Sequence, residues 1–303
     1  ELILLGFGNG PELQPLLFLL FLVIYLAALA GNLLIVVLVV ADRHLHTPMY
    51  YFVANLSAVE ICSVSTTLPR LLASLATGDR TISLQNCIVQ FNIYIILSNT
   101  ECLLLTAMCI DRYLAISHPL RYPALVNGRV CGHMVAWAWI NGIAYSIMLE
   151  AFILQSIYCG AKELDVLYCD FGRVYRPFCG ANIRTLQLVT SIYSIISNIL
   201  ILLLTLVTYI CIIVNILRIP SSTGRQKAFS TCSSHLIVVG IYYGTVITKY
   251  AVPVIDAIFQ KVIDVWFLIM VPLLNPILYC LRNKEVHQSL RKARVALVAF
   301  RHK

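Results

Sequence analysis

Seven long apolar runs are the feature of this sequence that most restricts its fold. A helix that spans a bilayer rises about 1.5 Å per residue and needs about 20 mostly apolar residues, and every run is near or above that length. A transmembrane β-barrel would instead show alternating segments of about ten residues. With 60% hydrophobic and 12% charged residues, the chain is too apolar for a soluble domain. The sequence predicts an all-α membrane protein, one domain over 1–303, with spans at about 15–40, 49–75, 87–116, 130–153, 186–217, 227–251 and 262–281.

The distribution of basic residues predicts the orientation of these spans. If the N-terminus lies outside, the inner connections carry fourteen Lys and Arg residues against three acidic ones. Cytoplasmic connections of membrane proteins carry such an excess. We therefore expect an extracellular N-terminus and a cytoplasmic C-terminus. The net charge of +8 is explained by this topology and by contact with lipid headgroups, and a nucleic-acid partner is not expected.

After the seventh span, apolar residues recur at helical spacing among basic and polar ones. Val286, Leu290, Ala293 and Leu297 follow an i, i+4, i+7, i+11 pattern. This pattern predicts an amphipathic eighth helix at about 284–298 that lies on the inner membrane surface.

Four cysteines fall on the outer side in this topology. Cys159, Cys169 and Cys179 are spaced ten residues apart in the longest outer connection, and Cys87 stands at the outer end of the third span. An oxidising exterior favours disulfides. The residues alone leave all three pairings of four cysteines open.

Two carboxyl groups lie deep within the spans. Glu60 is in the second span and Glu101 is in the third. An intramembrane carboxylate is costly and marks a functional site, and two at similar depth would repel each other if both were ionised. Either the pair shares a proton or a cation lies between them. Asn32 and Asn275 could supply further oxygens at the same depth.

Several motifs give the chain a family resemblance. The short ones are Gly31-Asn32, Asp111-Arg112-Tyr113, Trp139, and Asn275-Pro276 with Tyr279. In this order they resemble the rhodopsin-like (class A) G-protein-coupled receptors, which are seven-transmembrane helix bundles. The longer ones resemble the vertebrate olfactory receptor family, and they are LHTPMY at 45–50, MCIDRYLAIS at 108–117, KAFSTCSSHL at 227–236 and PLLNPILY at 272–279.

Other details refine or depart from this resemblance. Phe229 is similar to the tetrapod-type (class II) branch of the family. Glu60 stands where the family usually has Asp, and Cys109-Ile110 replaces Ala-Tyr. The one Asn-x-Ser/Thr sequence begins at Asn55 inside the second span, where the glycosylating enzyme would not reach it.

The resemblance implies pairings and roles that the residues alone leave open. It implies the disulfides Cys87–Cys169 and Cys159–Cys179. It implies Na⁺ between Glu60 and Glu101, and otherwise no required cofactor.

It also implies an activation switch at the inner end of the third span, in the Asp111-Arg112-Tyr113 motif. The Asp111 carboxylate holds Arg112 at rest. On activation Arg112 is freed to face the G protein, with Tyr209 and Tyr279 as hydroxyl partners.

The resemblance places the ligand pocket in the outer half of the bundle. It would lie between the third, fifth, sixth and seventh spans, under the loop after Cys169. Apolar walls with a few hydrogen-bonding groups suit a small, mostly apolar molecule. The candidate lining residues are Tyr94, Ile95, Ser98, Asn99, Ser194, Ser197, Asn198, Tyr243, Ile247, Tyr250 and Phe267.

The function that follows is that of an odorant receptor. The resemblance implies a plasma-membrane protein of olfactory neuron cilia that activates a stimulatory, olfactory-type G protein and raises cAMP. A rhodopsin-like receptor for a peptide or lipid is an alternative, but the KAFSTC and LHTPMY stretches argue against it. A transporter or channel would predict internal repeats, paired half-helices or a polar pore, and the sequence shows none. No residues are arranged for catalysis, so we do not expect an enzyme.

Overall fold

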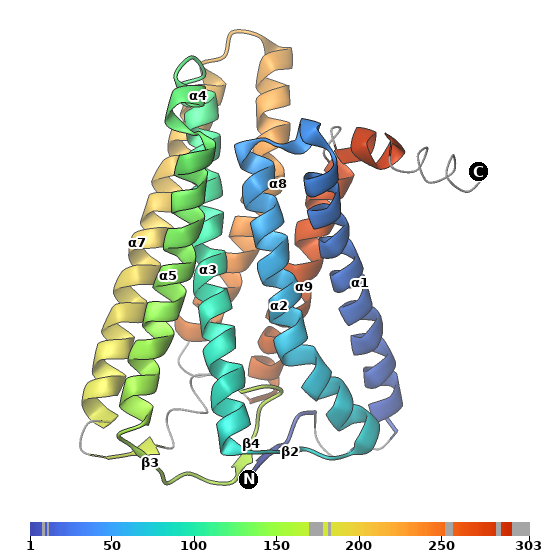
Figure 1. Ribbon diagram of the computed structural model, residues 1–303, viewed down its shortest axis with the longest axis vertical. Helices are drawn as coiled ribbons and strands as arrows, with labels where there is room; N and C mark the ends of the chain where they lie inside the picture. The colour runs from blue at the N-terminus through green and yellow to red at the C-terminus, as the bar shows by residue number, and fades with distance from the viewer. Residues whose placement is uncertain are drawn as a thin grey trace, which may run out of the picture.

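The computed structural model describes residues 1–7, 10, 12–169, 178–180, 183–251, 257–282 and 286–292. Within them, seven long helices form a bundle (Figure 1). The short helix α4 (Tyr122–Leu125) and the 3₁₀-helix η1 (Arg43–Leu45) lie in connections, and residues 286–292 are also helical. The long helices are α1 (Gln14–Ala41), α2 (Pro48–Thr77), α3 (Leu84–Ser117), α5 (Gly128–Ile153), α7 (Ile183–Leu217), α8 (Ser222–Ala251) and α9 (Ala257–Arg282).

Each span expected from the sequence lies inside one of these helices, which extend a few residues further. Five of the long helices, α1, α3, α5, α7 and α9, are long and apolar enough within the described residues to cross a membrane. In α2 the polar content is higher because it carries Glu60, Arg70 and several Ser and Thr residues. The first half of α8 is also polar, and its apolar part is His235–Thr245. Of the amphipathic helix expected at 284–298, only 286–292 are described.

Local sequence signals explain where these helices begin and end. Pro48 is at the start of α2, where its missing N–H would have no helical partner in any case. Gly78 ends the same helix with φ +75°, a left-handed conformation that favours glycine. The Ser83 hydroxyl caps α3 by accepting from the Asn86 amide at 3.1 Å. Asn127 caps α5 in the same way with its side-chain oxygen.

Helix α3 is the centre of the bundle. It packs against α2, α5, α7 and α8, and 61% of its most apolar stretch is buried, against 28% for α1. It approaches α5 closely at Gly142, where an added Cβ would lie 2.6 Å from the carbonyl oxygen of Ile96. A central helix of this kind can transmit a conformational change from one end of the bundle to the other.

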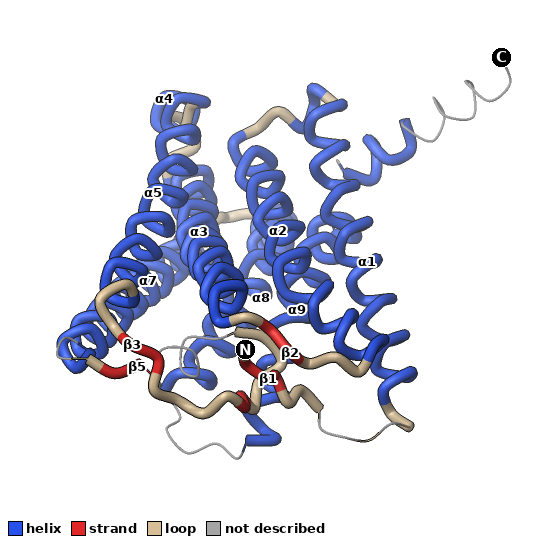
Figure 2. Tube along the Cα trace, turned by 60° about the horizontal axis from the view of Figure 1, so that its bottom comes forward, coloured by secondary structure: helices blue, strands red, loops and turns tan. Residues whose placement is uncertain are grey.

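Two small β-sheets lie at one end of the bundle, which we call the sheet end (Figures 1 and 2). In the first, β1 (Leu2–Leu4) is the middle strand, antiparallel to β2 (Thr81–Ile82) and parallel to β4 (Glu163–Leu164). In the second, β3 (Ile157–Tyr158) pairs with β5 (Phe178–Cys179). The sequence-based expectation of a bundle of helices alone missed these sheets, because strands of two or three residues are too short to show an alternating pattern.

Candidate functional site

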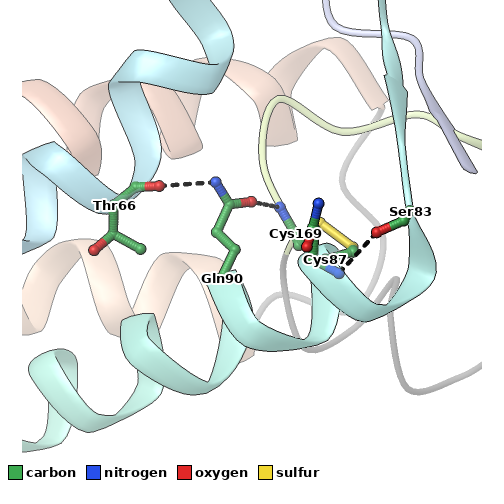
Figure 3. Close-up of a disulfide and its surroundings, with 6 residues drawn as sticks. Thr66, Ser83, Cys87, Gln90 and Cys169 are labelled. Atoms are coloured by element: carbon green, nitrogen blue, oxygen red, sulfur yellow. Dashed lines mark hydrogen bonds between the residues drawn. A yellow bond between two sulfur atoms is a disulfide. The ribbon is translucent and has the colours of Figure 1, made fainter.

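Both expected disulfides are present at the sheet end. Cys87 on α3 is bonded to Cys169, with the Cα atoms 5.5 Å apart, and Cys159 is bonded to Cys179, with the Cα atoms 5.8 Å apart. Gln90 lies one turn along α3 from Cys87. Its side-chain amide donates to the Thr66 carbonyl of α2 at 2.9 Å and its oxygen accepts from the Cys169 amide at 3.1 Å (Figure 3). The segment before Cys169 is therefore fixed to α3 both covalently and by a buried hydrogen bond.

The segment that precedes Cys169 packs into the bundle at the sheet end. Val166, Leu167 and Tyr168 are buried, and the Tyr168 ring lies 5.4 Å from the ring of Tyr94 on α3. An ion pair between Asp165 and Lys261 of α9 ties the same segment to another helix. The sequence analysis expected the loop after Cys169 to cover the interior, but residues 170–177 lie outside the described residues, and Tyr168 was missed.

Three of the expected pocket residues, one each from α3, α8 and α9, lie in the main core of the bundle. Tyr94, Tyr243 and Phe267 are all buried. The Tyr243 hydroxyl lies 3.4 Å from the Cys102 sulfur of α3. Among the described residues, the members of this group are aromatic or apolar with few polar atoms.

Tyr242 is a residue of this region that sequence reasoning missed. Its hydroxyl donates to the Ser98 carbonyl at 3.1 Å, and its ring lies 5.8 Å from that of Phe267. Its position next to Tyr243 was the available signal, but adjacent helical residues point about 100° apart and only one was expected to face inward. Both do, because α8 packs between α3 and α9 here.

The remaining candidates are arranged differently. The Asn99 side chain donates to the Ile95 carbonyl of its own helix at 2.9 Å, and Ser197 donates to the Tyr193 carbonyl of α7 at 2.6 Å. Asn198 and Ile247 are exposed. The side chains of Ser194 and Tyr250 lie outside the described residues.

The two intramembrane carboxyl groups face each other. Glu60 on α2 and Glu101 on α3 are buried next to one another. Two neighbouring buried carboxylates repel each other if both are ionised, so either they share a proton or a cation lies between them. Asn275 of α9 donates its amide to Glu60 at 2.7 Å. Asn32 also donates its amide, to the Ala28 and Pro272 carbonyls at 2.9 Å.

Three side-chain oxygens of these four residues are buried without a hydrogen-bond partner. They are Oε1 of Glu101, Oδ1 of Asn32 and Oδ1 of Asn275. Buried oxygens normally have a partner, and carboxylate and amide oxygens are suitable ligands for a hard cation. The donor set therefore fits a monovalent cation such as Na⁺.

At the opposite end of α3, Asp111 and Arg112 form an ion pair. The Arg112 Nη2 and Nε atoms lie 2.6 and 3.0 Å from Asp111 Oδ2, and Asp111 is fully buried. The Tyr122 hydroxyl of α4 donates to the other carboxylate oxygen at 2.6 Å. Burial and this hydrogen bond raise the pKa of Tyr122. The sequence analysis missed Tyr122, which is nine residues beyond the end of the motif, in the following connection.

Tyr209, one of the expected hydroxyl partners of Arg112 in the active state, has a bond to another residue in this arrangement. The Tyr209 hydroxyl of α7 is hydrogen-bonded to His235 of α8, and both residues are buried. Tyr113 packs edge-on against His118, with ring centroids 6.0 Å apart. The side chain of Tyr279 lies outside the described residues. Arg112 is paired with Asp111, and the role of this pair as a switch stays a prediction.

A second cluster at this end joins the connection after α1 to the helical residues 286–292. Asp42 accepts from the Ser289 hydroxyl at 2.5 Å and lies 3.5 Å from the Lys292 ammonium. The Ser289 hydrogen bond and those from His44 lower the pKa of Asp42. Val286 is buried against the main core. This cluster therefore anchors residues 286–292 to the bundle.

Comparisons with known proteins give one consistent result. A family model described as olfactory receptor matches residues 21–296. The chain is similar to olfactory receptor 10C1 of Homo sapiens, at 43% identity over 298 residues that cover 96% of the chain and 94% of that protein. It is 41% identical to olfactory receptor 11A1 of Homo sapiens, covering 96% of the chain and 93% of that protein. It is 38% identical to olfactory receptor 5AP2 of Mus musculus, with 96% and 92% covered.

Proposed function

The chain belongs to the olfactory receptor family of G-protein-coupled receptors, and we propose that it binds a small, mostly apolar odorant between α3, α8 and α9. The resemblance seen in the sequence is thereby confirmed, as are the seven-helix fold and the function of an odorant receptor. The protein is a multi-pass membrane receptor rather than an enzyme. Receptors of this family need no cofactor.

The observation that carries the proposed site is a group of buried aromatic residues on α3, α8 and α9. Tyr94, Tyr242, Tyr243 and Phe267 come from three helices and are buried in one core cluster, where the Tyr242 ring lies 5.8 Å from that of Phe267. Aromatic side chains offer a large apolar contact area, and each Tyr hydroxyl can orient one polar group of a ligand. An odorant with one oxygen-containing group and an apolar body matches this chemistry.

The two ends of the bundle have opposite characters, which supports an outward sheet end. The sheet end carries both disulfides, and disulfides persist in an oxidising exterior. The connections at the Arg112 end of the bundle are rich in Lys and Arg, as expected of a cytoplasmic face. The proposed location is the plasma membrane of olfactory neuron cilia, with an extracellular N-terminus, a cytoplasmic C-terminus and the basic inner surface in contact with lipid headgroups.

The proposed mechanism is a shift between two arrangements of the bundle. At rest, Asp111 holds Arg112 and Tyr209 is bonded to His235. An odorant that binds the active arrangement more tightly moves the inner end of α8 outward and frees Arg112. Tyr209 and Tyr279 then serve as its hydroxyl partners. The opened cleft accepts the C-terminal helix of a stimulatory, olfactory-type Gα, and cAMP rises.

The pair of carboxyl groups is proposed to bind Na⁺ in the resting arrangement. Glu60 and Glu101 would hold the ion together with the partnerless oxygens of Asn32 and Asn275. A bound Na⁺ would supply the positive charge that lets both carboxylates ionise. Replacement of sodium by choline at constant chloride should then raise basal signalling, and Glu101→Gln should abolish that dependence. Equal basal signalling in both salts would favour the shared proton.

The odorant site is tested by a cAMP assay in cells that co-express a stimulatory olfactory-type Gα. A panel of acids, alcohols, aldehydes, ketones and amines identifies an agonist first. Phe267→Leu should then raise the agonist concentration for half-maximal response about five- to tenfold, the loss of one good aromatic contact. Phe259→Leu, on the exposed surface of the same helix, is the matched control. Equal shifts in the two variants at equal surface expression would contradict the proposed site.

A further inference from the structure

Residues 164–169, which we call the strap, run from the first sheet to α3. At the sheet, the carbonyls of Leu164 and Val166 accept hydrogen bonds from the amides of residues 5 and 6 at 2.9 and 3.2 Å. At its other end, Cys169 is joined to α3 by a disulfide. The strap is therefore fixed at both ends, and its covalent bond makes it move together with α3.

The buried side chains of the strap pack against the proposed odorant site. Leu167 and Tyr168 belong to the same core cluster as Tyr94, Tyr243 and Phe267. The Tyr168 ring lies 5.4 Å from the ring of Tyr94 on α3. The strap therefore covers part of the proposed odorant site at the sheet end, and the present inference rests on that site.

An ion pair joins the strap to α9. The Val166 amide donates to the Leu164 carbonyl at 2.9 Å, so the chain makes a three-residue turn with Asp165 at its tip. The Asp165 side chain is 32% exposed and pairs with Lys261 of α9, whose side chain is 19% exposed. Phe267 follows six residues later on the same helix, about 9 Å further along it. The ion pair therefore links α9 to the strap on the outer side of the proposed site.

We propose that the Asp165–Lys261 ion pair is a latch that controls how fast molecules pass between the outside and the proposed odorant site. The disulfide keeps the strap on α3, so access from the α9 side requires α9 to separate from the strap. An ion pair between partly exposed groups separates at small cost because water solvates both charges. Asp165 and Lys261 are thus positioning residues, since neither has to touch the odorant.

The thiol of Cys102 reports this opening without any odorant. Cys102 is a buried free cysteine of α3, and its sulfur lies 3.4 Å from the hydroxyl of Tyr243, a residue of the proposed site. A buried thiol reacts only when a local opening admits the reagent, so its modification rate follows the population of the open arrangement. Loss of the latch raises that population and should accelerate the modification of Cys102.

The test measures the modification of the intact receptor in lipid nanodiscs by methyl methanethiosulfonate, with mass spectrometry of each cysteine peptide. The Cys102 thiolate attacks the reagent, forms a methyl disulfide and releases methanesulfinate. Lys261→Gln and Asp165→Asn should each raise the rate at Cys102 about two- to fivefold, as expected for the loss of a partly exposed ion pair. Cys232, which is buried in α8 near Arg112, should keep its rate in both variants.

Two double variants distinguish a latch from a merely structural role. Asp165→Lys combined with Lys261→Asp exchanges the two charges and should restore the slow rate at Cys102. Asp165→Asn combined with Lys261→Gln should be no faster than either single variant, because both changes remove the same interaction. This second pair decides the question if the exchanged pair does not fold.

Lys162→Gln removes an exposed charge from the same connection and is the matched control. A rate at Cys102 in Lys261→Gln that equals the rate in Lys162→Gln, or single-variant effects that multiply in the neutral double variant, would overturn the latch. Protection of Cys102 by an agonist from the cell-based panel tests the odorant site separately. Acceleration in Lys261→Gln without protection by the agonist would contradict the odorant site and retain the opening of the strap.

Discussion

The Tyr122 hydroxyl gives the most direct test of the resting switch. It donates to Oδ1 of Asp111 at 2.6 Å, while Arg112 occupies Oδ2 of the same carboxylate. Tyr122→Phe removes this hydrogen bond and keeps the ring. Because the bond fixes the carboxylate that holds Arg112, its loss should destabilise the resting arrangement and leave the active one unchanged. The variant should therefore signal without odorant.

The expected size follows from the burial of the two partners. A hydrogen bond to a charged group contributes about 1.5–3 kcal/mol when well buried. Asp111 is 1% exposed, but Tyr122 is only partly buried, so solvent screening reduces the contribution to about 1 kcal/mol. A difference of about 1 kcal/mol changes a two-state ratio about fivefold. Basal cAMP should therefore rise about fivefold while the resting state still dominates.

The assay compares basal cAMP at equal surface expression and normalises it to the maximal odorant response. Tyr51→Phe removes a hydroxyl from an exposed side chain of α2 and controls for the chemical change. Basal signalling in Tyr122→Phe that equals or falls below that of Tyr51→Phe would show that the Asp111–Tyr122 contact does not restrain the receptor.

Three further predictions concern the scaffold. Gly142→Ala places a methyl group 2.6 Å from a backbone oxygen of α3, so overpacking of about 1–3 kcal/mol should lower the thermal unfolding midpoint, whereas Gly132→Ala, with open space around it, should not. Gln90→Leu leaves a buried carbonyl and amide without partners and should lower surface expression and the midpoint by a similar free energy. The pKa of Asp42 is lowered mainly by Ser289, so its stabilisation is complete above the unfolded value of about 4 and is lost as the pH falls through the folded value. Ser289→Ala should therefore shift this loss to higher pH in an acid titration of the midpoint.

Features that are encoded in a long apolar run or in a contiguous motif could be predicted from the sequence. The bundle follows from apolar runs of about 20 residues, and the Asp111–Arg112 pair follows from a motif at a helix end. Glu60 and Glu101 could be singled out because an ionisable group in an apolar run is rare. In each case the signal lies in neighbouring residues or in one long run.

Contacts between short, distant segments could not be predicted in this way. The strand Leu2–Leu4 pairs with residues some eighty and one hundred and sixty positions away, and two or three residues carry no periodicity. In the sequence, Gln90 is an ordinary polar residue of a helix, because its hydrogen-bond partners lie in other segments of the chain. Tyr168 and Tyr122 lie in connections, where a side chain has no expected direction. The part of the site built by tertiary contacts between connections and helices was therefore missed.

The central claim is that an odorant bound among the aromatic residues of α3, α8 and α9 releases Arg112 at the other end of α3. The most direct measurement is nucleotide exchange on a purified stimulatory Gα by the receptor in nanodiscs, with and without an agonist from the cell-based panel. The account predicts that the agonist accelerates exchange in the wild-type protein, that Phe267→Leu requires a higher agonist concentration, and that Arg112→Ala abolishes exchange while agonist binding persists. Agonist-stimulated exchange that persists in Arg112→Ala would contradict it.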